Sequence, residues 1–236
     1  MATPGATIAE RITDLIGSDY ATIPSISYKD LIHAAFNEVA DMMSIDELLK
    51  YSRTPGTLTQ ASEWLVEDRK ILRVTRVDAD SSGIERAASY VDWHEFQRAQ
   101  DTGSIYQATA YSPVYSFDSK NAGAASLMIF PVCNNDGQVG KIWYFAYAGD
   151  SGGVVDVSLK TYTTLNTECY MPSTSIHAIV LKSCINILQA YLSEQIQDEE
   201  DVELMQMIQN QIQSLEKSFL QEMQRFLKKG SDVKGE

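Results

Sequence analysis

Residues 172–229 constrain the fold most, because they contain an apolar stripe too long to stay in water. From Met205 to Phe226 the apolar residues recur every three or four positions, which places them on one face of a helix. The stripe consists of Met205, Ile208, Ile212, Leu215, Phe219, Met223 and Phe226. An isolated helix is marginal in water, whereas burying each such side chain contributes about 1.5–3 kcal/mol. The sequence therefore predicts a long helix packed against a partner.

A preceding helix is predicted to begin near Pro172 and Ser173, and its apolar face is broader. That face is wide enough to meet the second helix and also a sheet or another subunit; it consists of Ile176, Val180, Cys184, Ile187, Leu188, Tyr191 and Leu192. Between the two helices lies an acidic hinge, in which Asp198 can cap the second helix and carboxylates at 199–201 suit its first turn. We interpret the hinge as a solvated helix start rather than a metal site, because its spacing is unlike a calcium loop. A Lys-Lys-Gly sequence at 228–230 predicts the helix end.

The first fifty residues are also predicted to be helical. Residues 7–16 carry isoleucines and leucine at helical spacing, and Gly17 is a natural stop. Ser44 with Glu47 forms a capping box that predicts a short helix. Between them, Ser27 is predicted to cap a helix whose apolar stripe consists of Leu31, Ala35, Val39 and Met42.

From Ile71 onward the sequence favours strands. Pro55-Gly56 reads as a loop, a short helix is predicted at 93–100, and Asn134-Asn135-Asp136-Gly137 predicts a hairpin turn between two of the strands. Strands are predicted at 71–77, 87–91, 105–111, 114–117, 127–132, 141–148 and 154–159.

Because helices and strands are segregated along the chain, the predicted fold class is α+β. We expect N- and C-terminal helices, from residues 7–52 and 172–229, to pack as a bundle. An antiparallel β-sheet region at 71–160 is inserted between them, and residues 1–236 form a single domain.

The charge of the chain narrows the classes of function. A formal net charge of -13 and a pI near 4.6 argue against a surface that grips nucleic acid, since such binding needs clustered Lys and Arg. Cysteines at 133, 169 and 184 are scattered and odd in number, which indicates reduced thiols and synthesis in a cytoplasm. The first residues lack the features of a signal peptide, and no apolar run approaches the roughly 18 residues of a membrane helix. We therefore expect a soluble protein with no membrane partner.

The sharpest short motif is Gly149-Asp150-Ser151-Gly152-Gly153, which matches the nucleophile motif of chymotrypsin-like serine proteases. A serine of this kind needs a histidine base and an acid that orients it. His33 falls on a predicted helix. His94 is too close to Ser151 in sequence to leave room for the two β-barrels of a chymotrypsin-like protease. Gly, Asp and Ser are also the residues that an ordinary loop between strands requires. We therefore favour a structural loop and keep a serine hydrolase as the second alternative.

Other candidate sites are weaker. His33, His94 and His177 are isolated in sequence, and no phosphate loop, zinc spacing or dinucleotide fingerprint is present, so neither cofactor nor metal is expected. The aromatic strand that contains Trp143 and Phe145 could stack bases, but it has little basic company. Sheet core or a subunit interface is the better interpretation of these aromatic side chains.

Three consecutive β-segments carry a family resemblance. These are Ser112-Pro113-Val114-Tyr115-Ser116-Phe117, Leu127-Met128-Ile129-Phe130-Pro131 and Ile142-Trp143-Tyr144-Phe145-Ala146-Tyr147. In this order they resemble the β-region of head-to-tail adaptor proteins of tailed bacteriophages. Met171-Pro172 opening a long helix, followed by an acidic hinge and a last helix, is similar to the way such adaptors end. The helix expected from Ser27 to Met43 likewise resembles their opening helices.

The resemblance implies a non-enzymatic virion protein of the neck, made in the host cytoplasm. Such adaptors form a homo-oligomeric ring, usually of twelve copies, which joins the portal protein to the tail or to other neck proteins. DNA passes through the lumen without tight binding. Another neck or tail-completion protein is the nearest alternative. The expected assembly or packing surface is the stripe from Met205 to Phe226 together with Trp143 and Phe145.

Overall fold

The computed structural model divides the chain into two compact units. The helical unit contains residues 1–51 and 146–236, and the β unit contains residues 52–145. The structure describes residues 5–17, 27–52, 56–58, 64–65, 69–78, 83–121, 124–133, 138–149, 156–195 and 202–229. The α+β class predicted from the sequence is confirmed. The β unit begins before the predicted residue 71 and ends before the predicted residue 160; that the two units make a single domain stays a prediction.

The described part of the helical unit contains six α-helices and two 3-10 helices. The α-helices are α1 (Ile8–Ile16), α2 (Tyr28–Met42), α3 (Ile45–Leu49), α5 (Leu165–Glu168), α6 (Ile176–Gln195) and α7 (Val202–Lys229). The 3-10 helices are η3 (Val157–Leu159) and η4 (Ser173–Ser175), of which η4 leads directly into α6. Thr7 caps α1 in a complete capping box, and Gly17 ends it with a φ of 90°, a conformation that suits glycine.

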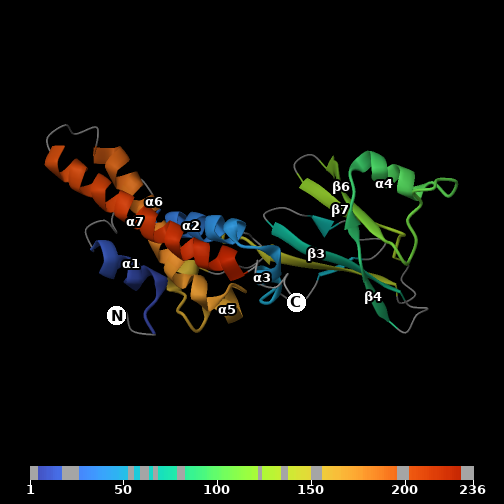
Figure 1. Ribbon diagram of the computed structural model, residues 1–236, viewed down its shortest axis with the longest axis horizontal. Helices are drawn as coiled ribbons and strands as arrows, with labels where there is room; N and C mark the ends of the chain where they lie inside the picture. Colours follow the sequence, from blue (N-terminus) through green and yellow to red (C-terminus); the bar gives the residue numbers. More distant parts are fainter. Residues whose placement is uncertain are drawn as a thin grey trace. The chain divides into compact units, whose positions relative to one another are not determined.

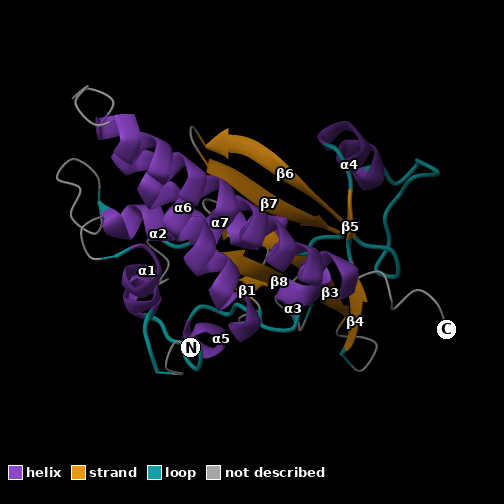
Figure 2. Cartoon of the chain, turned by 60° about the vertical axis from the view of Figure 1, so that its left-hand side comes forward, coloured by secondary structure: helices purple, strands orange, loops and turns teal. Residues whose placement is uncertain are grey.

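Helix α6 is the centre of the helical unit. It packs against α1, α2 and α7, and Figures 1 and 2 show it running beside α2 and α7. Apolar side chains occupy most of the circumference of this helix, as expected for a core helix, and its exposed positions among those described are His177, Gln189 and Ser193. Those at 5% exposure or less are Ile176, Ala178, Ile179, Val180, Leu181, Cys184, Ile185, Ile187 and Leu188. The N- and C-terminal helices thus share one core.

Helix α2 begins after Ser27 as predicted, and Ala35 and Val39 of the predicted stripe are buried, but the stripe is wrong at Leu31 and Met42. The side chains that α2 buries are Ile32, Ala35, Phe36, Val39 and Ala40. Leu31 is only half-buried, and 47% of Met42 is exposed. Nor does the Ser27 side chain form a capping hydrogen bond. The buried face is therefore one that contains Phe36, the largest apolar side chain of the helix.

The described strands of the β unit form two four-stranded sheets. One sheet has the order β1 (Gly56–Leu58), β8 (Val139–Ala146), β3 (Arg69–Asp78) and β4 (Ile84–Ala87). The other has the order β2 (Trp64–Leu65), β7 (Ala124–Phe130), β6 (Val114–Asn121) and β5 (Ser89–Tyr90). Helix α4 (Trp93–Gln100) follows β5 and packs against β6 and β7. The pairing of β5 with β6 is parallel, so the β-region is not purely antiparallel as predicted.

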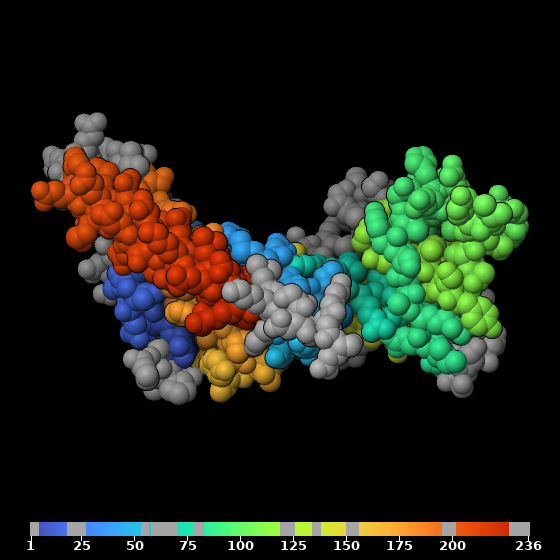
Figure 3. Space-filling view, viewed as in Figure 1, coloured from blue at the N-terminus to red at the C-terminus, as the bar shows by residue number. Residues whose placement is uncertain are grey.

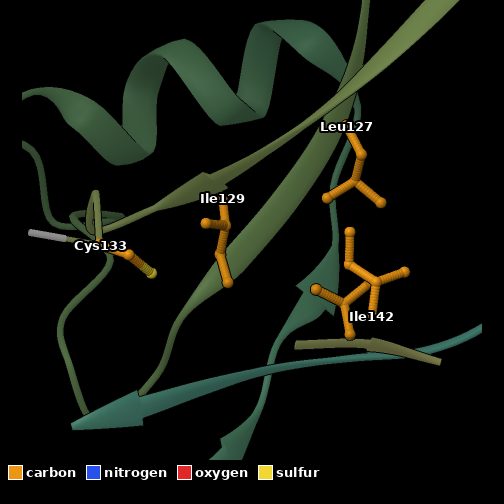
Figure 4. Packing of buried hydrophobic residues seen from close by; sticks show 5 residues of the cluster. Leu127, Ile129, Cys133 and Ile142 are labelled. Atoms are coloured by element: carbon orange, nitrogen blue, oxygen red, sulfur yellow. The ribbon is translucent and has the colours of Figure 1, made fainter. Parts of the chain in front are cut away.

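The core of the β unit is built from both sheets. Val74 from β3 and Ile142 from β8 meet Leu127 and Ile129 from β7, with Cys133 beside them. Figure 4 labels four of these side chains, Leu127, Ile129, Cys133 and Ile142, in the space that the strands enclose. Each of the five is at most 7% exposed, so the cluster supplies the apolar burial that small, twisted sheets need.

The predicted hairpin between β7 and β8 is wrong. Its turn residues, 134–137, lie outside the described residues, but β7 pairs with β6 and β2, whereas β8 pairs with β1 and lies next to β3. The two strands therefore belong to different sheets. Local turn chemistry favoured a hairpin, but Ile129 of β7 and Ile142 of β8 are both buried in one core cluster to which both sheets contribute.

Two other predicted strands are also wrong. Residues 105–111 form turns, and residues 157–159 form the 3-10 helix η3, with residues 154 and 155 outside the described part. Gly56 lies in β1 instead of a loop, and the short β2 was not predicted. The strands predicted at 71–77, 114–117, 127–132 and 141–148 match β3, β6, β7 and β8, with ends that shift by several residues, as is usual for boundaries set by pairing. The strand predicted at 87–91 is only partly right, because this stretch holds the end of β4 and the whole of β5, which belong to different sheets.

Candidate assembly surface

Most of the α7 stripe is buried within the chain. Five of its seven members are at most 8% exposed: Ile208, Ile212, Leu215, Phe219 and Met223. Met205 and Phe226, at the two ends of the stripe, are half-buried. Helix α6 is the main partner of α7. The stripe therefore holds the helical unit together, and little of it is left for another subunit.

An apolar hollow remains beside this stripe, and we call it the Phe219 hollow. It is lined by Met42 of α2 and by Phe219, Leu220, Met223 and Gln224 of α7, and its volume is about 360 Å³. Met42 is 47% exposed and Leu220 is 60% exposed. Figure 3 shows α7, in orange and red, along the surface of the helical unit. The hollow thus presents uncharged side chains to solvent.

Trp143 and Phe145 lie on β8 but not in equivalent surroundings. Phe145 is 1% exposed and is therefore unavailable to a partner in this conformation. Trp143 is half-buried, and the guanidinium of Arg73 from β3 lies over its ring at 5.4 Å from the centroid. Such a cation–π contact covers the aromatic face that base stacking would need. The structure does not favour this strand as a nucleic-acid platform.

A more exposed apolar feature is the segment after α4, which we call the 101–112 loop. It carries Ile105 at 92% exposure, Tyr106 at 66% and Tyr111 at 73%. Figure 1 shows the loop beside α4 before the chain enters β6. The strand predicted at 105–111 rested on β-branched and aromatic residues, whose preference for strands is easily overridden by tertiary context.

Local hydrogen bonds hold the 101–112 loop although its large side chains are exposed. Gly103 N donates to the Asp101 side chain at 3.0 Å, Tyr106 N donates to Ser104 Oγ at 3.1 Å, and Ala108 N donates to the Ala99 carbonyl at 3.0 Å. The guanidinium of Arg86 in β4 also lies over the ring of Tyr111 at 4.5 Å. The loop therefore has a defined conformation without burying its largest side chains.

A polar ladder on α2 was not predicted, although its spacing could have indicated it. Lys29, His33, Asn37 and Asp41 occur every four residues and so share one face of the helix. All four contact the segment that follows β8. Asn37 donates to the Ala148 carbonyl at 3.2 Å and accepts from Ala148 N at 2.7 Å, as a neighbouring strand would. Tyr147 donates its hydroxyl to Asp41 at 2.5 Å.

The far end of the ladder brings a histidine, an aspartate and a serine together. His33 Nε2 accepts a hydrogen bond from Val157 N at 3.3 Å and lies 3.7 Å from Asp156 Oδ1. Ser158 donates its hydroxyl to Asp156 at 2.5 Å, and Lys29 pairs with Asp156 at 3.1 Å. In a hydrolase triad the serine would donate to the histidine and the acid would hold the other ring nitrogen. Here the serine donates to the aspartate instead, and Asp156 caps η3 by also accepting from Ser158 N at 3.1 Å, so the cluster is structural.

The pKa values of this cluster agree with a structural role. Burial lowers the pKa of His33 below its ordinary value of 6.5, against the opposing pull of the Asp156 carboxylate. Burial acts to raise the pKa of Asp156, but hydrogen bonds from Ser158 and Lys29 outweigh it and lower that pKa. A neutral histidine next to an ionised aspartate fits the observed bond from Val157 N to the ring.

Other predicted site residues fall outside the described part of the chain. These are Ser151 with most of its loop, and the carboxylates of the hinge from Asp198 to Asp201. Within the described ranges, no group of three or more His, Cys, Asp or Glu side chains could hold a metal ion. The described cysteines are all buried free thiols, and burial raises the pKa of Cys184 to about 12.

One helix has the length and composition that could span a membrane, which the sequence analysis did not anticipate. It covers Ser173–Glu194, and 61% of the relevant window is buried inside the protein. A core helix passes the same test, and α6 is the core helix of its unit.

Comparison with protein-family models, with curated proteins and with solved structures found no match for this chain.

Proposed function

We propose that the chain is a head-to-tail adaptor of a tailed bacteriophage, a virion structural protein that forms a ring between portal and tail. The sequence resemblance suggests the family. The observation that supports a role in assembly is that large apolar side chains stay exposed on both units although each unit has a filled core. Ile105 and Tyr106 do so on the β unit, and Met42 and Leu220 on the helical unit. Single exposed apolar side chains are common, but these occur in pairs, Ile105 beside Tyr106 in one loop and Met42 with Leu220 around one hollow, and gathered apolar surface is typical of interaction sites.

The described chemistry favours assembly over catalysis. The serine, histidine and aspartate that meet at η3 are bonded in an order that leaves the serine without a base. The chain is strongly acidic, so DNA would pass a ring of such subunits without being gripped through its phosphates. Portal, tail and other neck proteins are the partners that this proposal implies, and twelve is the copy number that the resemblance suggests.

Electron cryomicroscopy of the particle that contains this chain tests the proposal. We expect a ring of copies between portal and tail, around a lumen wide enough for duplex DNA. Density for the chain in the capsid shell or at the tail tip would contradict it. A complementary measurement is filter retention of duplex DNA by the purified chain, where we expect none at about 150 mM salt.

A further inference from the structure

The 101–112 loop has features of a docking element rather than of a simple connection. Ordering a residue in one conformation costs roughly 1–2 kcal/mol, and this loop fixes its conformation without burying Ile105 or Tyr106. A loop that is ordered before it binds loses less entropy on association. Binding surfaces are commonly built on such loops of a rigid scaffold, here α4 and the β6 end of the sheet.

The charge pattern indicates which partner this loop suits. The sequence from Thr102 to Phe117 contains no Asp, Glu, Lys or Arg, although the whole chain has a net charge of -13. Copies of so acidic a chain repel one another, and a contact between uncharged surfaces adds no like-charge pairs to that repulsion. The Phe219 hollow is the matching surface, because its lining of Met42, Phe219, Leu220, Met223 and Gln224 is also uncharged.

The neighbouring hollow on the helical unit is a useful contrast. It shares Phe219 and Leu220 but is also lined by Lys182, Gln189 and Glu216, and its volume is smaller, at about 250 Å³. An isoleucine entering there would desolvate the Glu216 carboxylate and the ion pair that Lys182 makes with Glu38 at 2.7 Å, which is costly. In the Phe219 hollow it would meet apolar atoms and one amide.

We propose that the 101–112 loop of one copy inserts Ile105 and Tyr106 into the Phe219 hollow of a second copy. This inference rests on the proposed ring function and assigns its subunit contact. The loop belongs to the β unit and the hollow to the helical unit, so the contact joins two unlike surfaces. Repeated contacts of this heterologous kind generate a closed ring when the rotation closes.

The test uses two single substitutions, Ile105→Asp in the loop and Leu220→Asp in the hollow, in the full chain. Both side chains are exposed, so both variants should fold. Leu159→Asp is the matched control, because Leu159 is 63% exposed and lies in η3, outside both surfaces. Sedimentation velocity is measured up to about 1 mM protein, the range of weak association.

We expect wild type and Leu159→Asp to associate with affinities within about threefold of each other. Ile105→Asp and Leu220→Asp should each weaken association at least about 30-fold, the loss typical of a hot-spot residue. An equimolar mixture of these two variants should form a 1:1 dimer and nothing larger. Each mixed dimer would use the intact loop of Leu220→Asp and the intact hollow of Ile105→Asp, and would have no further competent pair.

Three results would overturn the inference: association of either variant at wild-type strength, a mixture that stays monomeric, or a wild type that is monomeric throughout the range. The proposed function is tested separately by imaging. A ring in the particle whose subunits meet through other surfaces would leave the adaptor role intact and remove this contact. Absence of any ring would remove the adaptor role itself.

Discussion

Replacing Phe219 by Asp tests the packing of α7, and the adjacent Leu220 provides a matched control. Phe219 is 6% exposed and Leu220 is 60% exposed, so the new carboxylate enters the packed interface in one variant and water in the other. Truncating a buried phenylalanine costs about 3–5 kcal/mol, and an unpaired buried carboxylate adds a desolvation cost. Whole domains are stable by only about 5–15 kcal/mol. Phe219→Asp should therefore lose most or all of the free energy of unfolding of the helical unit.

The chain offers separate probes for its two units. Tryptophans occur at 64, 93 and 143, all in the β unit, so intrinsic fluorescence reports on that unit. Far-ultraviolet circular dichroism reports mainly on the helices, most of which lie in the helical unit. In urea, Phe219→Asp should abolish or strongly shift the dichroism transition, whereas Leu220→Asp should change the free energy of unfolding by less than about 0.5 kcal/mol.

An unchanged urea transition in Phe219→Asp would contradict the packing of α7. If Phe219→Asp unfolds at the same urea concentration as wild type by circular dichroism, the α7 stripe does not pack against the rest of the helical unit. The stripe would then be a free surface, and the assignment of Phe219 to the core would be wrong.

Three further predictions concern the polar contacts and the glycine-rich loop. Asn37→Ala removes both hydrogen bonds to Ala148, so the free energy of unfolding measured by circular dichroism should fall by about 1–3 kcal/mol. Asn37→Asp can still accept from the Ala148 amide and should lie between wild type and Asn37→Ala. Because burial lowers the pKa of His33, its contribution is complete above the ordinary value of 6.5 and is lost as pH falls through the lower folded value. The urea midpoint should therefore fall between about pH 7 and pH 5, and by less in His33→Gln. Ser151→Ala should fold like wild type, and the wild type should not react with a fluorophosphonate probe; stoichiometric labelling at Ser151 would establish a hydrolase.

Local rules predicted the helices well because their signals are local. Thr7 with Glu10 forms a capping box within four residues, and Asp92 caps α4 at the predicted position. The α7 stripe has seven apolar members at spacings of three and four, and this regular pattern defines one buried face. The predicted α2 stripe is wrong at Leu31 and Met42 because apolar residues occur on adjacent faces of the helix. Packing against α6 decides that Phe36 rather than Met42 is buried.

The sheet and the candidate surface could not be predicted in the same way. Which strand pairs with β7 depends on residues far apart in sequence, such as Trp64 opposite Leu127. Ile105 is a residue type that favours strands. Its 92% exposure depends on how the rest of the β unit packs, which the local sequence does not contain. The Phe219 hollow joins the end of α2 to α7, so no window of sequence contains it.

The helical unit is discontinuous, and this sets an order of events during synthesis. Residues 1–51 leave the ribosome before the whole β unit, and the central helix α6 follows only after residue 175. Because domains tend to fold as units while the chain is made, the β unit can complete its core while α1 and α2 still lack their partner. The apolar faces of Ile12 and Phe36 are therefore bare on the nascent chain. The polar ladder on α2 can then bind Tyr147, Ala148, Asp156 and Val157 before α6 emerges, so these contacts can form before the last core is closed.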